Sequence, residues 1–266
     1  MALLEIEGLG KTYGEGEGAT HAIGDISFEL GEREFVCVVG PSGCGKTTLL
    51  KCMSGLLEPT RGEVRLRGER VDGPPEAMAL VFQEYSRSLL PWLSVRGNVV
   101  LPLRHKKLEK PETTRLVEEA VEAVGLTTFI DRFPWELSGG MQQRVAIARA
   151  LAYQPEILLM DEPFASVDAQ TRGDLEDLIL EVRDRFEMTI LFVTHDIDES
   201  VYLSDRIVVL SPSPTEVREI LDVGLPRPRD QVATKELHDF AHLRAHVYRL
   251  IKRAAPAQAE EPAPAA

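Results

Sequence analysis

The sequence predicts an α/β fold in which a parallel β-sheet is covered on both faces. Short apolar runs rich in β-branched residues alternate with segments of helical periodicity, which is the pattern of strand–helix–strand units. A glycine-rich loop follows one expected strand and opens a helix. Between Glu84 and Pro134 the alternation stops, and we expect a mostly helical segment there before the strands resume.

The expected strands are short runs bounded by turn residues. The first two are joined by a glycine-rich segment, residues 14–18, which is typical of a mobile surface loop. The strands are expected near Leu3–Glu7, Ala22–Leu30, Phe35–Gly40, Glu63–Arg67, Met78–Gln83, Ile157–Asp161, Thr189–Thr194 and Arg206–Leu210. Because strands and helices alternate over most of the chain, most of these strands should run parallel in one sheet.

Helical periodicity completes the expected organisation. It is found at Lys46–Ser54, Glu112–Val124, Gly140–Ala152, Ala169–Phe186, Asp196–Leu203 and about Lys235–Arg253. We expect a single domain over residues 1–253, with a helical subdomain at about residues 84–153 inserted in it. Residues 254–266 are rich in Ala, Pro and Glu, a composition typical of disordered tails.

Composition restricts the partners of the chain. Hydrophobic residues make up 44% and charged residues 27% of the 266 residues, as in a globular domain with a large core. The net charge of −13 argues against a nucleic-acid partner, because a duplex-binding face needs clustered Lys and Arg. It also argues against docking on anionic lipid, so membrane association should go through a protein partner.

We expect neither a membrane span nor a secretory signal. The longest run without charged residues or His, Phe35–Gly45, is much shorter than the roughly 20 apolar residues of a spanning helix. The first residues, MALLEIEGLGK, lack a basic region followed by an apolar core. The three cysteines, Cys37, Cys44 and Cys52, are odd in number and closely spaced, which fits a reducing cytosol.

A phosphate-binding loop is predicted at residues 40–47, whose sequence GPSGCGKT matches G-x-x-x-x-G-K-[ST] at every fixed position. Glycines let backbone N–H groups approach phosphate oxygens, and the following helix N-terminus adds positive potential. Lys46 can neutralise the β- and γ-phosphates, and the Thr47 hydroxyl can ligate Mg²⁺. The alternatives are a plain glycine-rich turn and, for Cys44, either a redox-sensitive thiol or a small loop residue.

Two adjacent acids end the apolar run Ile157–Met160. A buried strand would deliver Asp161 to the carboxyl edge of the sheet beside the phosphate loop, where it can hold Mg²⁺ directly or through water. Glu162 would point elsewhere and could polarise an attacking water. Alone this pattern is weak, because many strands end in acids; beside the phosphate loop it predicts a hydrolytic site.

Residues 137–144 read LSGGMQQR and form the most discriminating stretch. Here the chain resembles the ABC ATPase family, whose signature loop reads LSGGQ or a close variant; Met141 takes the fifth place and Gln142 the sixth. The resemblance runs from about Leu3 to Arg253. It implies a P-loop NTPase fold with a RecA-like core, an antiparallel β subdomain and an inserted helical subdomain.

The signature loop also has a physical meaning. A hydroxyl, glycine amides and a helix N-terminus make a second anion site at Ser138. One chain does not need two phosphate sites for one nucleotide. The resemblance implies a head-to-tail homodimer, in which Ser138 and Gly140 of one subunit face the γ-phosphate held by Lys46 of the other. A simple helix cap at Ser138 is the plainer interpretation and is compatible with this role.

The resemblance assigns roles to single residues as well. Tyr13 matches the aromatic residue that stacks on adenine, Gln83 the glutamine that contacts Mg²⁺ and the attacking water, and His195 the histidine that senses the γ-phosphate. The expected set comprises catalytic Glu162, His195 and Gln83; Mg²⁺ ligands Thr47, Gln83 and Asp161; and ATP-binding Tyr13, Gly40, Pro41, Ser42, Gly43, Cys44, Gly45, Lys46, Thr47, Thr48, Ser138, Gly139, Gly140, Gln142 and Asp168.

Three other patterns have plainer explanations or stay open. The loop before Asp168 reads Ala-Ser-Val where the family has Ser or Gly and then Ala-Leu, which leaves its contacts across the dimer open. His238, His242 and His246 could share a helix face, but an apolar stripe competes for it, so we expect a polar flank rather than a metal site. The acids between Asp174 and Glu181 are typical of a charged helix exterior.

The finer resemblance is to ATPase subunits of nitrate, sulfonate and taurine importers, carried by VFQEYSRSLLPWLSVRGNV, DEPFASVDAQTR and LPRPRD. It implies membrane permease subunits, an external substrate-binding protein and a place on the cytoplasmic face of the membrane. In the family, the region after Gln83 receives a helix of the permease, and Leu89, Leu90 and Trp92 are either apolar contacts for it or part of the core. Alternatives are an exporter or lipid transporter, a non-transport ABC ATPase, and another P-loop enzyme such as a kinase.

Overall fold

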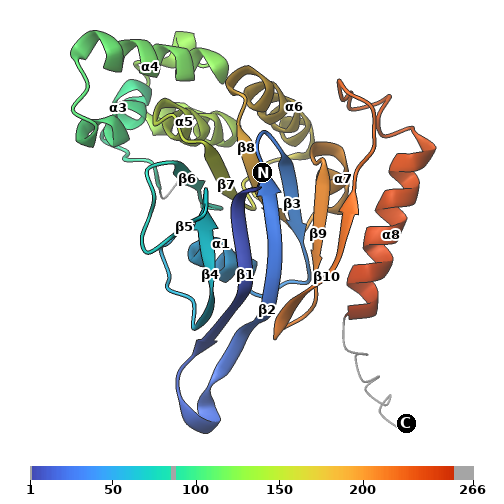
Figure 1. The fold of residues 1–266 in the computed structure, drawn as a ribbon. Helices are drawn as coiled ribbons and strands as arrows, with labels where there is room; N and C mark the ends of the chain where they lie inside the picture. Colours follow the sequence, from blue (N-terminus) through green and yellow to red (C-terminus); the bar gives the residue numbers. More distant parts are fainter. Residues whose placement is uncertain (1, 85–87, 255–266) are drawn as a thin grey trace, which may run out of the picture.

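A computed structural model describes residues 2–84 and 88–254 of the chain. In these ranges the strands join into one ten-stranded, strongly twisted sheet in the order β5-β4-β1-β2-β10-β9-β3-β8-β7-β6 (Figure 1). The strands are β1 Ala2–Tyr13, β2 Thr20–Gly31, β3 Phe35–Val39, β4 Arg61–Leu66, β5 Glu69–Arg70, β6 Met78–Val81, β7 Ile157–Asp161, β8 Thr189–Thr194, β9 Arg206–Leu210 and β10 Thr215–Asp222.

The sheet has a parallel part and an antiparallel part. Strands β9, β3, β8, β7 and β6 pair in parallel, and β3, β7 and β8 are buried along their whole length. Strands β2, β1, β4 and β5 pair antiparallel. Strand β10 joins the two parts, because it runs antiparallel to β9 and parallel to β2. The predicted α/β class and the antiparallel subdomain are both confirmed.

The helices are α1 Lys46–Met53, α3 Val95–Val100, α4 Lys110–Ala123, α5 Gly139–Ala152, α6 Ala169–Phe186, α7 Ile197–Leu203 and α8 His238–Ala254. Short 3-10 turns occur at Gly16–Gly18, Leu101–His105, Thr127–Phe129 and Pro134–Glu136. Helices α3, α4 and α5 lie together at one end of the molecule, and α8 runs beside β10 at the opposite side (Figure 1). Among the described residues, no helix combines the length and the apolar character needed to cross a membrane.

Two apolar clusters hold the layers together, one on each face of the parallel strands. Phe35, Cys37 and Val39 of β3 point into a cluster with α3 to α8, because side chains alternate across a strand. The intervening Val36 and Val38 point into a second cluster with α1 and the antiparallel strands β1 and β2. The second face is therefore covered largely by the twisted sheet itself, with α1 as its helix.

The structure extends the sequence predictions at several points. Strands β5 and β10 and helix α3 were not predicted: β5 has two residues, and α3 contains three valines and Gly97, residues that disfavour an isolated helix. Burial of Val95 and Val99 stabilises α3 within the helical region. Helix α8 begins at His238 and includes Ala254, so the predicted tail is wrong at that residue; residues 255–266 lie outside the described part.

Candidate nucleotide site

The phosphate loop lies between buried strand β3 and helix α1, the context that the sequence predicted. Gly43 and Gly45 have φ angles of 74° and 99°, in the left-handed region that side chains disfavour. A Cβ on Gly45 would also lie 3.1 Å from the Ala22 carbonyl oxygen. Both glycines are therefore required by the loop conformation, and they leave the backbone of the loop open to a close anion.

Lys46 lies at the centre of this loop. Its side chain is 6% exposed, and its Nζ donates to the carbonyl oxygens of Gly40 at 3.0 Å and Pro41 at 3.1 Å. The same atom lies 3.7 Å from Oε1 of Glu162. The ammonium group is thus held over the loop by two backbone carbonyl oxygens, and its three donors suit phosphate.

Asp161 and Thr47 provide oxygen ligands beside Lys46. Asp161 ends β7 and is 6% exposed. Burial raises the pKa of its carboxyl group, and a hydrogen bond with the Thr47 side chain opposes this rise. A buried carboxylate next to a hydroxyl at the mouth of a phosphate loop is a donor set that fits Mg²⁺, which prefers a few protein oxygens together with phosphate oxygens.

Glu162 is the point at which three strand ends converge. Its Oε2 lies 2.8 Å from Nδ1 of His195, after β8, and 3.5 Å from Nε2 of Gln83, after β6. Its φ angle of 42° is unusual for a residue with a side chain, and it turns Glu162 away from the direction taken by Asp161. The structure therefore brings Glu162, His195 and Gln83 together, with Lys46 close to the same carboxylate.

His195 is reachable from solvent. Its side chain is 56% exposed, and it lines a groove of about 820 Å³ between α7 and α8. Tyr13 occupies the opposite flank of the loop: its ring is 43% exposed and its hydroxyl lies 3.3 Å from Oγ1 of Thr48. An exposed aromatic ring beside the first turn of α1 is a suitable surface for stacking a base.

The predicted signature residues lie at the starts of helices α5 and α6. Ser138 caps α5, with Oγ accepting from Met141 N at 3.3 Å, and Asp168 caps α6, with Oδ1 accepting from Thr171 N at 3.0 Å. Asp168 also accepts from Thr171 Oγ1 at 2.7 Å; hydrogen bonds from the Thr171 amide and hydroxyl lower the pKa of Asp168. Ser138, Gly139 and Asp168 are all exposed.

Gly140 and Gln142 have more local contacts than the other signature residues. A Cβ at Gly140 would lie 2.4 Å from Cγ2 of Thr171, so only glycine lets α5 approach α6 this closely. The Nε2 of Gln142 donates to the carbonyl oxygens of Pro134 at 3.0 Å and Leu137 at 3.2 Å. Gln142 therefore fixes its own loop, which the sequence did not indicate.

The two sets of predicted residues are separate within one chain. No hydrogen bond or ion pair between described residues joins the set around Lys46 and Glu162 to the set of Ser138, Gly139, Gly140, Gln142 and Asp168. Each set can bind an anion, the first through an ammonium group and loop amides and the second through a hydroxyl and a helix N-terminus. One chain thus presents two separate surfaces whose groups are suited to an anion.

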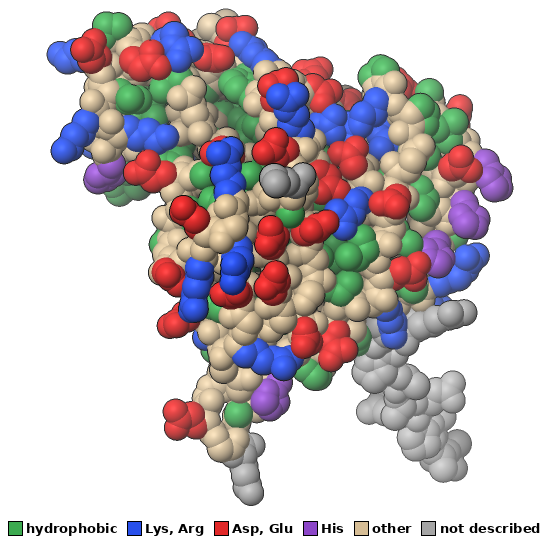
Figure 2. Space-filling view, viewed as in Figure 1, with side chains coloured by type: hydrophobic (Ala, Val, Ile, Leu, Met, Phe, Trp, Pro, Cys, Tyr) green, Lys and Arg blue, Asp and Glu red, His purple; other side chains and the backbone are tan. Residues whose placement is uncertain are grey.

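The other candidate groups of the sequence have structural roles. All three cysteines are free and buried, and burial raises the pKa of the Cys44 thiol, which favours a small loop residue over a reactive one. His246 pairs with Glu219 at 2.9 Å, and in the described ranges no three side chains of His, Cys, Asp or Glu are grouped as metal ligands. Figure 2 shows acidic side chains interspersed with Lys and Arg on the visible face, without a continuous basic patch.

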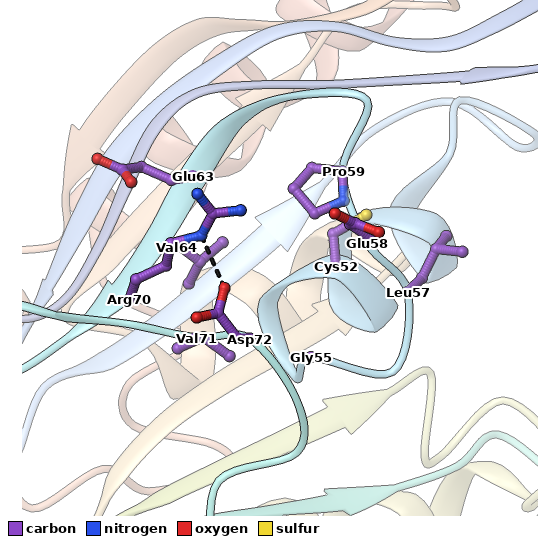
Figure 3. Close-up of a pocket in the computed structure, with 10 residues that line it drawn as sticks. All are labelled: Cys52, Gly55, Leu57, Glu58, Pro59, Glu63, Val64, Arg70, Val71 and Asp72. Carbon is purple, nitrogen blue, oxygen red and sulfur yellow. Dashed lines mark ion pairs between the residues drawn. The ribbon is translucent and has the colours of Figure 1, made fainter.

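A separate pocket of about 210 Å³ lies past the C-terminal end of α1 (Figure 3). Cys52 and Glu58 line one side, and an ion pair of 2.8 Å between Arg70 and Asp72 lies on the other. None of the predicted site residues lines it. The phosphate loop and the residues around Glu162 lie instead at the carboxyl edge of the parallel strands.

Comparison with known proteins agrees with this geometry. Residues 23–165 match the ABC transporter family. An ABC transporter ATP-binding protein of Methanocaldococcus jannaschii is 45% identical over 94% of this chain and 91% of its own. A nitrate import ATP-binding protein of Synechococcus elongatus is 40% identical (94% and 92% covered), and an aliphatic sulfonates import ATP-binding protein of Bacillus thuringiensis is 41% identical (90% and 96%).

A solved structure shares the fold. It is a dimeric ATP-binding cassette in a post-hydrolysis state, bound to ADP and phosphate. It superposes with a TM-score of 0.72 at 32% sequence identity, and the match covers 83% of this chain and 98% of that one.

Proposed function

The chain belongs to the ABC transporter family, and we propose that it is the ATP-hydrolysing subunit of an importer for a small anion. The observation that carries this proposal is the convergence of Gln83, His195 and Lys46 on the carboxylate of Glu162, beside a phosphate loop. An acid held between a histidine, an amide and an ammonium group can orient and polarise a water for attack on a terminal phosphate.

ATP is held by the phosphate loop in this proposal. Backbone N–H groups of residues 42–48 contact the phosphates, Lys46 neutralises the β- and γ-phosphates, and Tyr13 stacks on the adenine. Thr47, Asp161 and Gln83 would hold Mg²⁺, which would supply positive charge to the phosphate oxygens when bound. The buried Asp161 hydrogen-bonded with Thr47 supports this assignment.

Hydrolysis follows from the side chains around Glu162. Glu162 accepts a hydrogen bond from the attacking water, and Gln83 helps to orient that water. His195 shares a short 2.8 Å contact with Glu162 and its side chain is 56% exposed, so in this proposal it can bond a γ-phosphate oxygen as charge develops there. Lys46 stabilises the same charge.

A head-to-tail homodimer completes the site. Ser138, Gly139 and Asp168 are exposed, whereas Gly140 is buried against α6. None of the four makes a bond to the loop of Lys46 in its own chain, which leaves the three exposed residues available to the nucleotide of a second chain. ATP then lies between two subunits and draws them together. Hydrolysis removes the γ-phosphate that links both surfaces, and the pair reopens.

In this proposal, the closing and reopening of the pair moves membrane permease subunits at the cytoplasmic face of the membrane. Leu89 is 3% exposed and belongs to the core, whereas the ring of Trp92 is 68% exposed and is available to a permease segment. Asn98 holds the adjoining segment: its Oδ1 accepts from Leu90 N at 2.8 Å and its Nδ2 donates to Leu90 O at 3.1 Å. The segment just before Trp92 is therefore held in place by Asn98.

The cargo class is proposed from the relatives named as nitrate and aliphatic sulfonates import proteins. We infer uptake of a small anion such as nitrate, a sulfonate or taurine, delivered by an external substrate-binding protein. Deletion of the gene should abolish uptake of one among nitrate, taurine, alkanesulfonates and aromatic acids, measured with isotope-labelled substrates. Unchanged uptake of all four would exclude this cargo class while leaving ATP hydrolysis untouched.

A further inference from the structure

Arg172, in the first turn of α6, contacts two loops that carry predicted site residues. Its Nη1 donates to Oδ2 of Asp196 at 3.0 Å, one residue after His195. Its Nη2 donates to the carbonyl oxygen of Val167 at 3.4 Å, one residue before Asp168. A single planar guanidinium group therefore bridges the signature side and the catalytic side of the chain.

The backbone on both sides of His195 is held by the same network. Thr194 Oγ1 donates to Oε2 of Glu199 at 2.5 Å and accepts from Asp196 N at 2.9 Å. Oδ1 of Asp196 accepts from Glu199 N at 3.2 Å, which caps α7. The buried Nε of Arg172 lies 3.6 Å from Oε1 of Glu199. Arg172 thus contacts both carboxylates that fix the residues flanking His195.

The placement of Arg172 distinguishes it from an ordinary surface ion pair. Its side chain is 30% exposed and Glu199 is 4% exposed, so the contacts are partly shielded from water. Each polar contact of the guanidinium goes to residues 167, 196 or 199 and to no other part of the described chain. A contact that only stabilised the fold would not need to connect the loop before Asp168 with the segment after His195.

We propose that Arg172 is a positioning residue that ties the loop ending at Asp168 to the segment carrying His195. Movement of Asp168, when a second chain approaches, is transmitted through Val167, Arg172 and Asp196 to the histidine beside Glu162. Arg172 is not itself one of the residues proposed to bind the nucleotide or to act on the attacking water. The inference rests on the proposed function, because it assumes that His195 acts in hydrolysis and that Asp168 faces the partner subunit.

The test compares Arg172→Ala and Arg172→Lys with Arg185→Ala in the full-length protein. Arg185 lies on the same helix, and its guanidinium pairs with Glu122 at 3.5 Å and not with either loop. Amide hydrogen exchange at residues 165–168 and 195–198 should quicken about tenfold or more in Arg172→Ala, at both segments together, and stay unchanged in Arg185→Ala. Arg172→Lys should give an intermediate result, since an ammonium cannot bond both loops at once.

Steady-state ATP hydrolysis gives the second readout. The kcat of Arg172→Ala should fall by about 10- to 100-fold, because His195 is misplaced, with KM for ATP within about threefold. The double variant Arg172→Ala with Asp196→Asn should be no slower than Arg172→Ala by more than about twofold, since both changes break one link. If Arg172→Ala does not fold, Arg172→Lys carries the same comparisons.

The proposal is contradicted if exchange changes at one segment only, or if kcat of the folded Arg172 variants stays within about twofold of the unsubstituted protein. These results can be told apart from failure of the proposed function. If the unsubstituted protein hydrolyses ATP and Glu162→Gln does not, the proposed function is supported independently of the results for the Arg172 variants. If the unsubstituted protein does not hydrolyse ATP, the exchange data still decide whether Arg172 links the loops.

Discussion

The residues around Lys46 and those around Ser138 are built in opposite ways. The first group is internally connected: Glu162 lies within 2.8 Å of His195, 3.5 Å of Gln83 and 3.7 Å of Lys46. The second group consists of exposed helix caps, such as Ser138 and Asp168, whose bonds are to their own helices. The first group is therefore held together by contacts within one chain, whereas the hydroxyl and helix N-termini of the second face outward, where a helix N-terminus can attract an anion.

The largest effect is expected from a substitution in the connected group, which consists of Lys46, Glu162, His195 and Gln83. Substitution of Glu162 by Gln keeps the shape and the contact with Gln83 but removes the carboxylate that polarises water. Turnover should fall by about 10²–10³-fold or more, while ATP binding is retained. ATPase assays together with equilibrium binding of a fluorescent ATP analogue measure both. Turnover at the normal rate would mean that Glu162 has another role.

The exposed group, which consists of the helix caps at Ser138 and Asp168, can be altered by a substitution that does not unfold helix α5. In Ser138→Asp the new carboxylate can still cap α5, but it repels the γ-phosphate of a facing chain. Turnover should fall about 10²-fold with an unchanged melting temperature. Ser94→Asp is the matched control, because Ser94 caps α3 by accepting from Gly97 N at 3.2 Å and lies outside the predicted site. Equal loss in both variants would contradict the assignment.

A buried carboxyl group next to the connected group, that of Glu199, should give a pH dependence of stability; it accepts a hydrogen bond from Thr194, the residue before His195. Burial raises the pKa of Glu199, behind His195, from 4.5 to about 7. Between these values the folded chain holds a proton that the unfolded chain has lost, so stability falls as pH rises from 4.5 to 7. The loss from this group should be about 3 kcal/mol. Urea unfolding at pH 5 and pH 8 measures it, and Glu199→Gln should show a smaller loss; equal losses would exclude Glu199 as the cause.

A smaller effect should come from the contact between α5 and α6 in the exposed group. Gly140→Ala places a methyl group 2.4 Å from Cγ2 of Thr171, and overpacking of this kind costs about 1–3 kcal/mol. Thr171→Ser removes that methyl group but keeps the hydroxyl that bonds Asp168 at 2.7 Å. The double variant should therefore regain most of the lost stability in urea unfolding. No regain would show that the strain lies elsewhere.

Much of the connected group could be predicted from the sequence, because Lys46 and Glu162 lie in short motifs that indicate a function. The phosphate loop at residues 40–47 and the two acids at the end of β7 are each short contiguous motifs, and parallel strands bring their carboxyl ends to one edge. The roles of Gln83 and His195 came from a family resemblance, and their contacts with Glu162 are seen only in the structure, since nothing in the spacing of single residues fixes which strands are neighbours.

Elements defined by tertiary contacts could not be predicted in the same way. Strand β10 is stabilised by pairing with both β9 and β2, which is not visible in a segment that alternates exposed and partly buried residues. The bridge made by Arg172 joins residues 167, 196 and 199, and an isolated arginine in a charged helix gives no signal of such contacts. Such features depend on how distant segments are brought together.

The central claim is that Lys46 and Ser138 are two halves of one site, completed only by two chains. Mixing Lys46→Ala with Ser138→Asp tests it most directly, because each variant alone lacks any complete site, whereas a mixed pair contains one. Each variant alone should be nearly inactive, and an equimolar mixture should recover about a quarter of normal ATP hydrolysis, since half of the pairs are mixed and each has one site of two. A mixture no more active than its separate, folded components would contradict the account.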